Sequence, residues 1–268
     1  MRTLMRELVV VTGASGGIGA AICWRLHADG YGVIAQYGVS HERARALGER
    51  IRRDGGFFEA IACDLSSPDG PSTVTQAVQA MLGANRDHTL RGLVNNAAKL
   101  LGPAFGEATV DQFDDYMAVN VRAPFFLSQG LAPLMPPGGS IVNISSASAH
   151  FSSPGDIVYA MTKSALESLT RNMAEAIAPA GLRVNAVVPG FTDNGHPAFQ
   201  NPAAQEYMSS FSVLGGVADP DVVAEAVSFL ISDRARRTTG TVLDVTGGST
   251  LGARHRRASS VRALLPDT

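Results

Sequence analysis

The 268-residue sequence has few of the residues that form disulfide cross-links in small domains or bind metals. Its two cysteines, Cys23 and Cys63, are too few for a disulfide framework or a thiolate site, and we expect buried thiols in a reducing compartment. The histidines are scattered, and neither an H-E-x-x-H motif nor a cysteine cluster is present, so no metal site is expected. The 24 acidic and 22 basic residues nearly balance, which disfavours nucleic acid or an anionic membrane as a partner.

Long hydrophobic runs are also missing. No apolar stretch approaches the roughly 20 residues of a membrane span, and the run Leu8–Val11 after the basic N-terminus is about half the length that a signal sequence needs. We therefore expect a cytoplasmic protein that acts on a small molecule. A hydrophobic content of 45% over this length is enough for one large, well-buried α/β domain.

Short β-branched runs alternate with longer helical patterns along the chain, which is typical of βαβ units and a parallel sheet. The pattern predicts a single-domain, Rossmann-like, doubly wound sheet over residues 1–252. The basic stretch 253–268 shows no such pattern and is expected to be a mobile tail. The seven expected strands are 8–12, 32–37, 59–63, 92–95, 140–145, 183–188 and 241–245.

A glycine-rich turn joins the first strand to the helix expected over 18–29. Gly13, Gly17 and Gly19 follow a G-x-x-x-G-x-G spacing, which differs from the commoner G-x-G-x-x-G fingerprint. Glycines allow a tight turn and close approach to a pyrophosphate, while the start of the helix favours negative charge. We expect a dinucleotide phosphate here, although a purely structural turn is the alternative.

The end of the second strand should select the cofactor, because an acidic side chain there binds the ribose 2′-hydroxyl of NAD. The chain offers Gln36, Tyr37 and Gly38 instead, and Ser40, His41 and Arg43 follow. These residues could accept a 2′-phosphate, which favours NADP(H) without excluding NAD(H). A solvated helix start would explain Arg43 almost as well.

Tyr159 and Lys163 are four residues apart on the helix expected over 156–178, so their side chains share one face. The only other lysine among the 22 basic residues is Lys99, which makes a chance Tyr-x-x-x-Lys less plausible. One or two nearby cations, here Lys163 and an oxidised nicotinamide ring, can lower the pKa of a phenol from its usual value of about 10. Ser146 ends the strand expected before this helix and could bind a substrate oxygen. Four nearby serines compete for that role: Ser145, Ser148, Ser152 and Ser153.

The ordered set of motifs resembles the classical short-chain dehydrogenase/reductase family, in particular 3-oxoacyl-ACP reductases. The motifs are Thr12 to Gly19, Asn95-Asn96-Ala97-Ala98, Asn120, Ser146, Tyr159-x-x-x-Lys163 and Pro189-Gly190. The resemblance implies that Tyr159 is the general acid/base, that Lys163 assists it and holds the nicotinamide ribose, that Ser146 binds the substrate oxygen and that Asn120 completes a proton relay. It implies a cofactor site made of Gly13, Ser15, Gly17, Ile18, Gly19, Tyr37, Ser40, Asp64, Leu65, Asn96, Ala97, Ala98, Tyr159, Lys163, Pro189, Gly190 and Thr192.

Three positions depart from the pattern of that family. Ala98 stands where the family usually has glycine, Asn194 where a threonine usually contacts the carboxamide, and Thr246 where an aspartate is usual. With the family, the apolar-faced helices expected over 110–134 and 156–178 suggest a homodimer or homotetramer. Residues 191–211 carry several aromatic side chains and are expected to form a mobile flap over the site.

We expect an NADP(H)-dependent oxidoreductase that moves a hydride between nicotinamide and a carbonyl or secondary alcohol, most simply as ketone reduction. One alternative is an NADP(H)-binding regulator that has lost its chemistry, which would not need all of Asn120, Ser146, Tyr159 and Lys163. Another is an S-adenosylmethionine-dependent methyltransferase, although such enzymes expect an acidic residue where Tyr37 and Gly38 stand.

Overall fold

A computed structural model describes residues 6–100 and 102–251 of the chain. They form one α/β domain around a seven-stranded sheet, in which every pair of neighbouring strands is parallel. This confirms the predicted fold class. The expected tail, residues 253–268, lies outside the described residues, as does the last residue of the predicted domain. No helix in the described part is both long and apolar enough to cross a bilayer.

The strand order is β3-β2-β1-β4-β5-β6-β7, so the chain reverses direction across the sheet between β1 and β4. Ligands of doubly wound folds bind beyond the carboxyl ends of the strands at such a reversal. All seven strands match those expected from the sequence, within a few residues at their ends. Their bounds are β1 Arg6–Val11, β2 Gly32–Tyr37, β3 Phe58–Ala62, β4 His88–Asn95, β5 Ser140–Ile144, β6 Arg183–Pro189 and β7 Val242–Val245.

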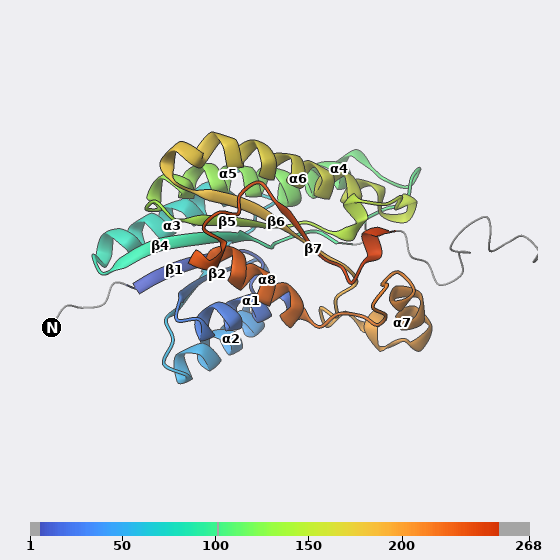
Figure 1. Ribbon diagram of the computed structural model, residues 1–268, viewed down its shortest axis with the longest axis horizontal. Helices are drawn as coiled ribbons and strands as arrows, with labels where there is room; N and C mark the ends of the chain where they lie inside the picture. Colours follow the sequence, from blue (N-terminus) through green and yellow to red (C-terminus); the bar gives the residue numbers. More distant parts are fainter. Residues whose placement is uncertain (1–5, 101, 252–268) are drawn as a thin grey trace, which may run out of the picture.

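Helices cover both faces of the sheet (Figure 1). On one face lie α1 (Gly17–Ala28), α2 (His41–Arg53) and α8 (Pro220–Ile231); α3 (Gly70–Ala84), α5 (Ala123–Leu131) and α6 (Ile157–Ile177) lie on the other. Each face has its own apolar core, and β1 supplies both because alternate side chains point to opposite faces. Two covered faces explain why the strands read as nearly continuous hydrophobic runs.

The helix expected over 110–134 is interrupted. It consists of α4 (Val110–Met117), a π-helical turn η1 (Ala118–Arg122), α5 and a short 3₁₀ turn η2 (Ala132–Leu134). The sequence did not reveal this π-turn, which accommodates one extra residue within a single turn. Such turns occur often at functional sites, and this one contains Asn120.

The segment after β6 extends from the body of the domain. It includes a 3₁₀ turn η6 (Pro197–Gln200) and the short helix α7 (Pro202–Ser209), which lies apart from the two helical layers in Figure 1. The segment returns through an isolated parallel bridge between Thr192 and Ala218. This is the position that the sequence assigns to a flap, and its mobility stays a prediction.

Candidate active site

The glycine-rich turn after β1 is held by side chains from two neighbouring strands. Gln36, only 2% exposed, accepts a hydrogen bond from the Gly13 amide at 3.0 Å and donates from Nε2 to the Cys63 carbonyl at 2.7 Å. Asn96 donates from Nδ2 to the carbonyl oxygens of Thr12 and Gly13. Gln36, one of the three residues at the strand end where an NAD-binding turn would carry an acid, therefore has a structural role of its own, which the sequence did not reveal.

Three glycines of this turn have no room for a side chain. A Cβ added to Gly13 would lie 2.8 Å from Ala97 Cα, one on Gly17 2.6 Å from the Asn194 carbonyl oxygen, and one on Gly19 2.3 Å from the Gly13 carbonyl oxygen. Gly13 also has a φ of 63°, which is costly for other residues. Ser15 and Ile18 are half-buried in the same turn. The spacing is thus a geometric requirement.

Helix α1 begins within this glycine-rich segment, at Gly17, and has neither a side-chain cap nor an acidic residue in its first turn. Its leading amides are therefore available for an anion, as expected for a pyrophosphate.

The segment after β2 gathers polar and basic groups. The Tyr37 hydroxyl and His41 Nδ1 are 2.7 Å apart, and Arg43 donates to Ser40 Oγ at 2.7 Å. Ser40, His41 and Arg43 lie at or near the start of α2, with Arg43 exposed. Three of the groups that the sequence nominated for a 2′-phosphate are therefore close together beyond one strand end.

The ends of β3 and β4 place the predicted adenosine-side residues. Asp64 accepts hydrogen bonds from the amide and the hydroxyl of Ser66, both at 2.8 Å, and these bonds hold the pKa of its carboxyl below the usual value. Leu65 is buried, and the Ala97 amide donates to Thr12 Oγ1 at 3.0 Å, with Ala98 half-buried beside it. These residues follow β3 and β4, the strands on either side of the β2–β1 pair, at the carboxyl ends of the strands.

The Tyr159–Lys163 pair lies on the first turns of α6, against the end of β5. Lys163 Nζ is 5.5 Å from the centre of the Tyr159 ring and donates to the Ile144 carbonyl at 2.7 Å. Ser146 bonds the Tyr159 hydroxyl. The structure therefore brings together the phenol, the ammonium and the serine that the sequence proposed. It also distinguishes Ser146 from Ser145, whose hydroxyl bonds Glu167 instead.

Without a bound cofactor, Lys163 does not lower the pKa of Tyr159, and the expected lowering by Lys163 together with an oxidised nicotinamide ring stays a prediction. Burial raises the pKa of Tyr159 to about 12, and the hydrogen bond from Ser146 opposes this only in part. Burial also lowers the pKa of Lys163 to about 8, because no carboxylate compensates its charge. Desolvation disfavours the ionised form of each group and is the largest cause of both shifts. The chain's own groups therefore keep the phenol protonated, and a cation supplied by a ligand would have to lower its pKa.

Asn120 lies in the π-turn and is almost completely buried. Its side chain bonds both backbone groups of Lys99: Oδ1 accepts from the amide at 2.8 Å and Nδ2 donates to the carbonyl at 3.1 Å. Nδ2 also donates to Thr162 Oγ1 at 3.0 Å. Asn120 thus connects the loop after β4 to α6 beside Lys163, and its role in a water relay stays a prediction.

The loop after β6 also lies at the carboxyl ends of the strands. Pro189 ends the strand, Gly190 packs against the backbone of Thr246, and the buried Thr192 donates to the Gly190 carbonyl at 3.1 Å. Of the three unusual positions, Thr246 caps the turn after β7 by accepting from the amides of Gly248 and Ser249.

Asn194, another of the unusual positions, accepts from the His196 amide at 3.0 Å. Its side chain therefore forms a local turn, while its backbone packs on Gly17.

Aromatic side chains from two loops meet above this edge. Phe211 lies 5.7 Å from Phe151, 5.4 Å from Phe191 and 5.1 Å from Tyr207, measured between ring centres. Phe151 comes from the loop that also carries Ser146, and Phe191 follows Gly190 directly. The aromatic residues that the sequence placed in the flap are thus partly packed on one another, yet Tyr207 remains 63% exposed.

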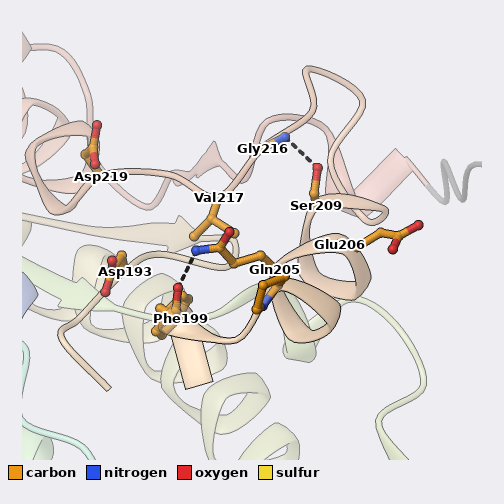
Figure 2. Close-up of a pocket in the computed structure, with 9 residues that line it drawn as sticks. Asp193, Phe199, Gln205, Glu206, Ser209, Gly216, Val217 and Asp219 are labelled. Atoms are coloured by element: carbon orange, nitrogen blue, oxygen red, sulfur yellow. Dashed lines mark hydrogen bonds between the residues drawn. The ribbon is translucent and has the colours of Figure 1, made fainter. Parts of the chain in front are cut away.

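A cavity of about 480 Å³ lies on another side of the flap (Figure 2). Gln205 donates to the Phe199 carbonyl and Gly216 donates to Ser209 Oγ within it. None of its nine lining residues is a predicted catalytic residue, so we do not assign the reaction to this cavity. The lining residues are Asp193, Phe199, Pro202, Gln205, Glu206, Ser209, Gly216, Val217 and Asp219.

Sequence reasoning also missed a buried chain of amides under the site. Asn95 donates to Asn143 Oδ1 at 2.9 Å, and Asn143 donates to Thr170 Oγ1 at 2.9 Å. The expectation of two buried cysteines holds for Cys23, whereas Cys63 is half-buried. Within the described ranges, no three His, Cys, Asp or Glu side chains come together as a metal site would require.

Comparison with known proteins gives a consistent result. Residues 13–250 match the family model described as Enoyl-(Acyl carrier protein) reductase. The chain is 32% identical to the uncharacterized oxidoreductase YmfI of Bacillus subtilis, over 91% of this chain and 99% of that protein. It is 31% identical to the 3-oxoacyl-[acyl-carrier-protein] reductase FabG of Staphylococcus aureus, over 91% and 98% of the two chains.

Among solved structures, the angucycline C-6 ketoreductase LanV with bound NADP is similar over 93% of this chain and 100% of its own, with 36% identity and a TM-score of 0.88. The motifs, the strand order, the Ser146–Tyr159–Lys163 arrangement and these matches agree over almost the whole described domain. The chain therefore belongs to the classical short-chain dehydrogenase/reductase family.

Proposed function

We propose that the protein is an NADPH-dependent reductase of ketones. The proposal rests on one observation: Ser146, Tyr159 and Lys163 lie together at the carboxyl ends of the strands, where the glycine-rich turn also lies. A proton donor and a dinucleotide cradle at one edge are what carbonyl reduction requires. The relative LanV is described as a ketoreductase with bound NADP, which supports the same chemistry.

The cradle fits a dinucleotide. The turn at Gly13, Gly17 and Gly19 presents bare backbone, and the uncapped start of α1 offers amides to the pyrophosphate. Beyond β2, Ser40 and Arg43 would meet the 2′-phosphate of NADPH, and the buried Gln36 holds the turn where NAD enzymes carry an acid. Asp64 and residues 96–98 would contact the adenosine half, and Pro189 to Thr192 the nicotinamide half.

Bound NADPH would supply the hydride. Tyr159 holds a proton over the whole neutral range, because burial keeps its pKa near 12, and it would donate that proton to the carbonyl oxygen. Ser146 would donate a hydrogen bond to the same oxygen and stabilise the negative charge that develops there. Lys163 would bond the ribose, while Asn120 keeps the loop after β4 against α6.

The aromatic cluster favours a substrate with a large apolar, ring-bearing body. Phe151, Phe191, Tyr207 and Phe211 gather on the two loops that follow the catalytic strand ends. Stacking and edge contacts on such rings are the usual way to hold an aromatic ligand. The relative LanV is described with rabelomycin bound as well as NADP, which is in line with a substrate of this kind.

Association of subunits and a cytoplasmic location are part of the proposal. Phe113, Phe125, Phe126 and Met161 expose large apolar side chains on α4, α5 and α6, as a homodimer or homotetramer interface would require. Light scattering on the purified protein should give two or four chains, and replacing Phe125 and Phe126 by serine should yield smaller species. A monomeric wild-type protein would remove this part of the proposal.

The central experiment follows nicotinamide absorbance with NADPH and a panel of cyclic and linear ketones, with an enoyl thioester included. We expect oxidation of NADPH by ring-bearing ketones, and a loss of about 10²- to 10⁴-fold in kcat for Tyr159→Phe, with NADPH binding retained. Tyr31→Phe is the matched control, because Tyr31 lies at the start of β2, at the opposite edge of the sheet. NADPH binding without turnover of any ketone would favour the regulator instead.

A further inference from the structure

Glu167 is a buried carboxylate that the proposed mechanism does not use. Its side chain is only 9% exposed, and it lies on α6 one helical turn beyond Lys163. Its Oε1 accepts from Ser145 Oγ at 2.6 Å and lies 2.9 Å from His150 Nε2. Burial of a charge is costly unless it is hydrogen-bonded, and these two bonds are what compensates Glu167.

The position of Glu167 continues the catalytic row on α6. Tyr159, Lys163 and Glu167 follow at intervals of four residues, so they lie one above the other on one helix face. Their partners are three consecutive residues, 144–146: Lys163 bonds the carbonyl of the first, Glu167 the hydroxyl of the second and Tyr159 the hydroxyl of the third. Glu167 therefore forms the third contact of one continuous interface between α6 and the end of β5.

Glu167 also connects the two ends of the turn that carries Ser146. Ser145 precedes Ser146, and His150 follows the 3₁₀ turn η3 (Ala147–Ala149) that Ser146 caps. The sheet already fixes Ser145, whose amide donates to the Val187 carbonyl at 2.8 Å. The far end of the turn is less tightly held: its bonds to α6 are the His150–Glu167 contact and a longer one, 3.4 Å, from Ser164 to the Ala149 carbonyl.

We propose that Glu167 is a positioning residue, which holds Ser146 in line with Tyr159 by bonding both ends of the 145–150 turn to α6. The proposal rests on the proposed function, because it assigns to Ser146 a role in turnover. Loss of the carboxylate would let the turn shift while leaving the glycine-rich cradle unchanged. Its effect should therefore fall on turnover and not on cofactor binding.

The test compares Glu167→Leu, which removes the acceptor, with Glu167→Gln, which keeps one. We expect kcat of the leucine variant to fall by about 10- to 100-fold, as small displacements of positioned groups do, with the Kd of NADPH within about twofold of wild type. The glutamine variant should recover to within about threefold of wild type. Glu175→Leu is the matched control, because Glu175 is exposed two turns further along α6.

A second variant keeps the test open if Glu167→Leu folds poorly. Ser145→Ala removes one of the two hydrogen bonds by loss of a single oxygen, and it should lower kcat less than Glu167→Leu does. The double variant should lose no more kcat than Glu167→Leu alone, because both changes act on one network. Additive losses would contradict a shared role.

The outcomes separate this inference from the proposed function. A wild-type protein that reduces no carbonyl overturns the proposed function, and this inference with it. An active wild-type protein whose Glu167→Leu variant melts at lower temperature but keeps its kcat overturns the inference alone, since Glu167 would then be only structural.

Discussion

Lys163 should make the stability of the protein rise with pH, which is unusual for a lysine. The residue is 2% exposed, and within the described residues its ammonium group donates to the Ile144 carbonyl, so burial lowers its pKa from 10.5 to about 8. Below pH 8 both folded and unfolded chains carry the proton, and folding must bury a charge. Above this value the folded chain releases the proton first, so the penalty is relieved as the pH approaches 10.5.

The size of the effect follows from the pKa difference. A difference of about 2.5 units corresponds to about 3 kcal/mol in total, of which about 2 kcal/mol falls between pH 7 and pH 9.5. The assay is urea unfolding of the wild-type protein and of Lys163→Met at both pH values, without cofactor. Other ionisable groups also change the free energy of unfolding between pH 7 and pH 9.5, including the thiol of Cys23, whose pKa is raised by burial. Their contributions are the same in both proteins.

We therefore expect the wild-type protein to gain about 2 kcal/mol of unfolding free energy relative to Lys163→Met on going from pH 7 to pH 9.5. Equal pH slopes for the two proteins would refute the reasoning, because Lys163 would then titrate alike in both states.

Three further predictions concern the cradle. Gly17→Ala should abolish NADPH binding or shift the loop after β6, because the new Cβ would lie 2.6 Å from the Asn194 carbonyl oxygen. Gly83→Ala is the control, since a Cβ added there meets nothing within 4 Å. Calorimetric titration of both variants with NADPH measures the difference in binding. Gln36→Leu should cost about 1–3 kcal/mol in urea unfolding, because the Gly13 amide and the Cys63 carbonyl lose their buried partner, and an unchanged midpoint would argue against that role. Arg43→Ala should weaken the binding of NADPH by about 10- to 100-fold and leave the binding of NADH unaffected. Arg45→Ala is the control and should change neither affinity, because the Arg45 guanidinium pairs with Glu42 and Glu49. Equal losses of affinity for both cofactors would exclude a contact between Arg43 and the 2′-phosphate.

The local sequence patterns were sufficient to predict the elements of the fold. β-Branched runs of four to six residues gave the seven strands, and the glycines around Gly17 marked the turn, because these features depend on neighbours along the chain. The spacing of Tyr159 and Lys163 likewise placed both side chains on one helix face. The π-turn at Asn120 was not predicted from the sequence; the structure shows it between α4 and α5.

Only the tertiary structure decided which distant side chains are hydrogen-bonded to one another and how burial shifts the pKa of the ionisable groups. Gln36 bonds Gly13 across 23 residues and Glu167 bonds Ser145 across 22, contacts that exist because parallel strands carry distant segments to one edge of the sheet. The pKa of Tyr159 in the free protein depends on how much water the surrounding loops exclude, which the spacing of Tyr159 and Lys163 cannot show. Sequence spacing fixes which side chains can meet on a helix, whereas desolvation and long-range contacts arise only when the chain is packed.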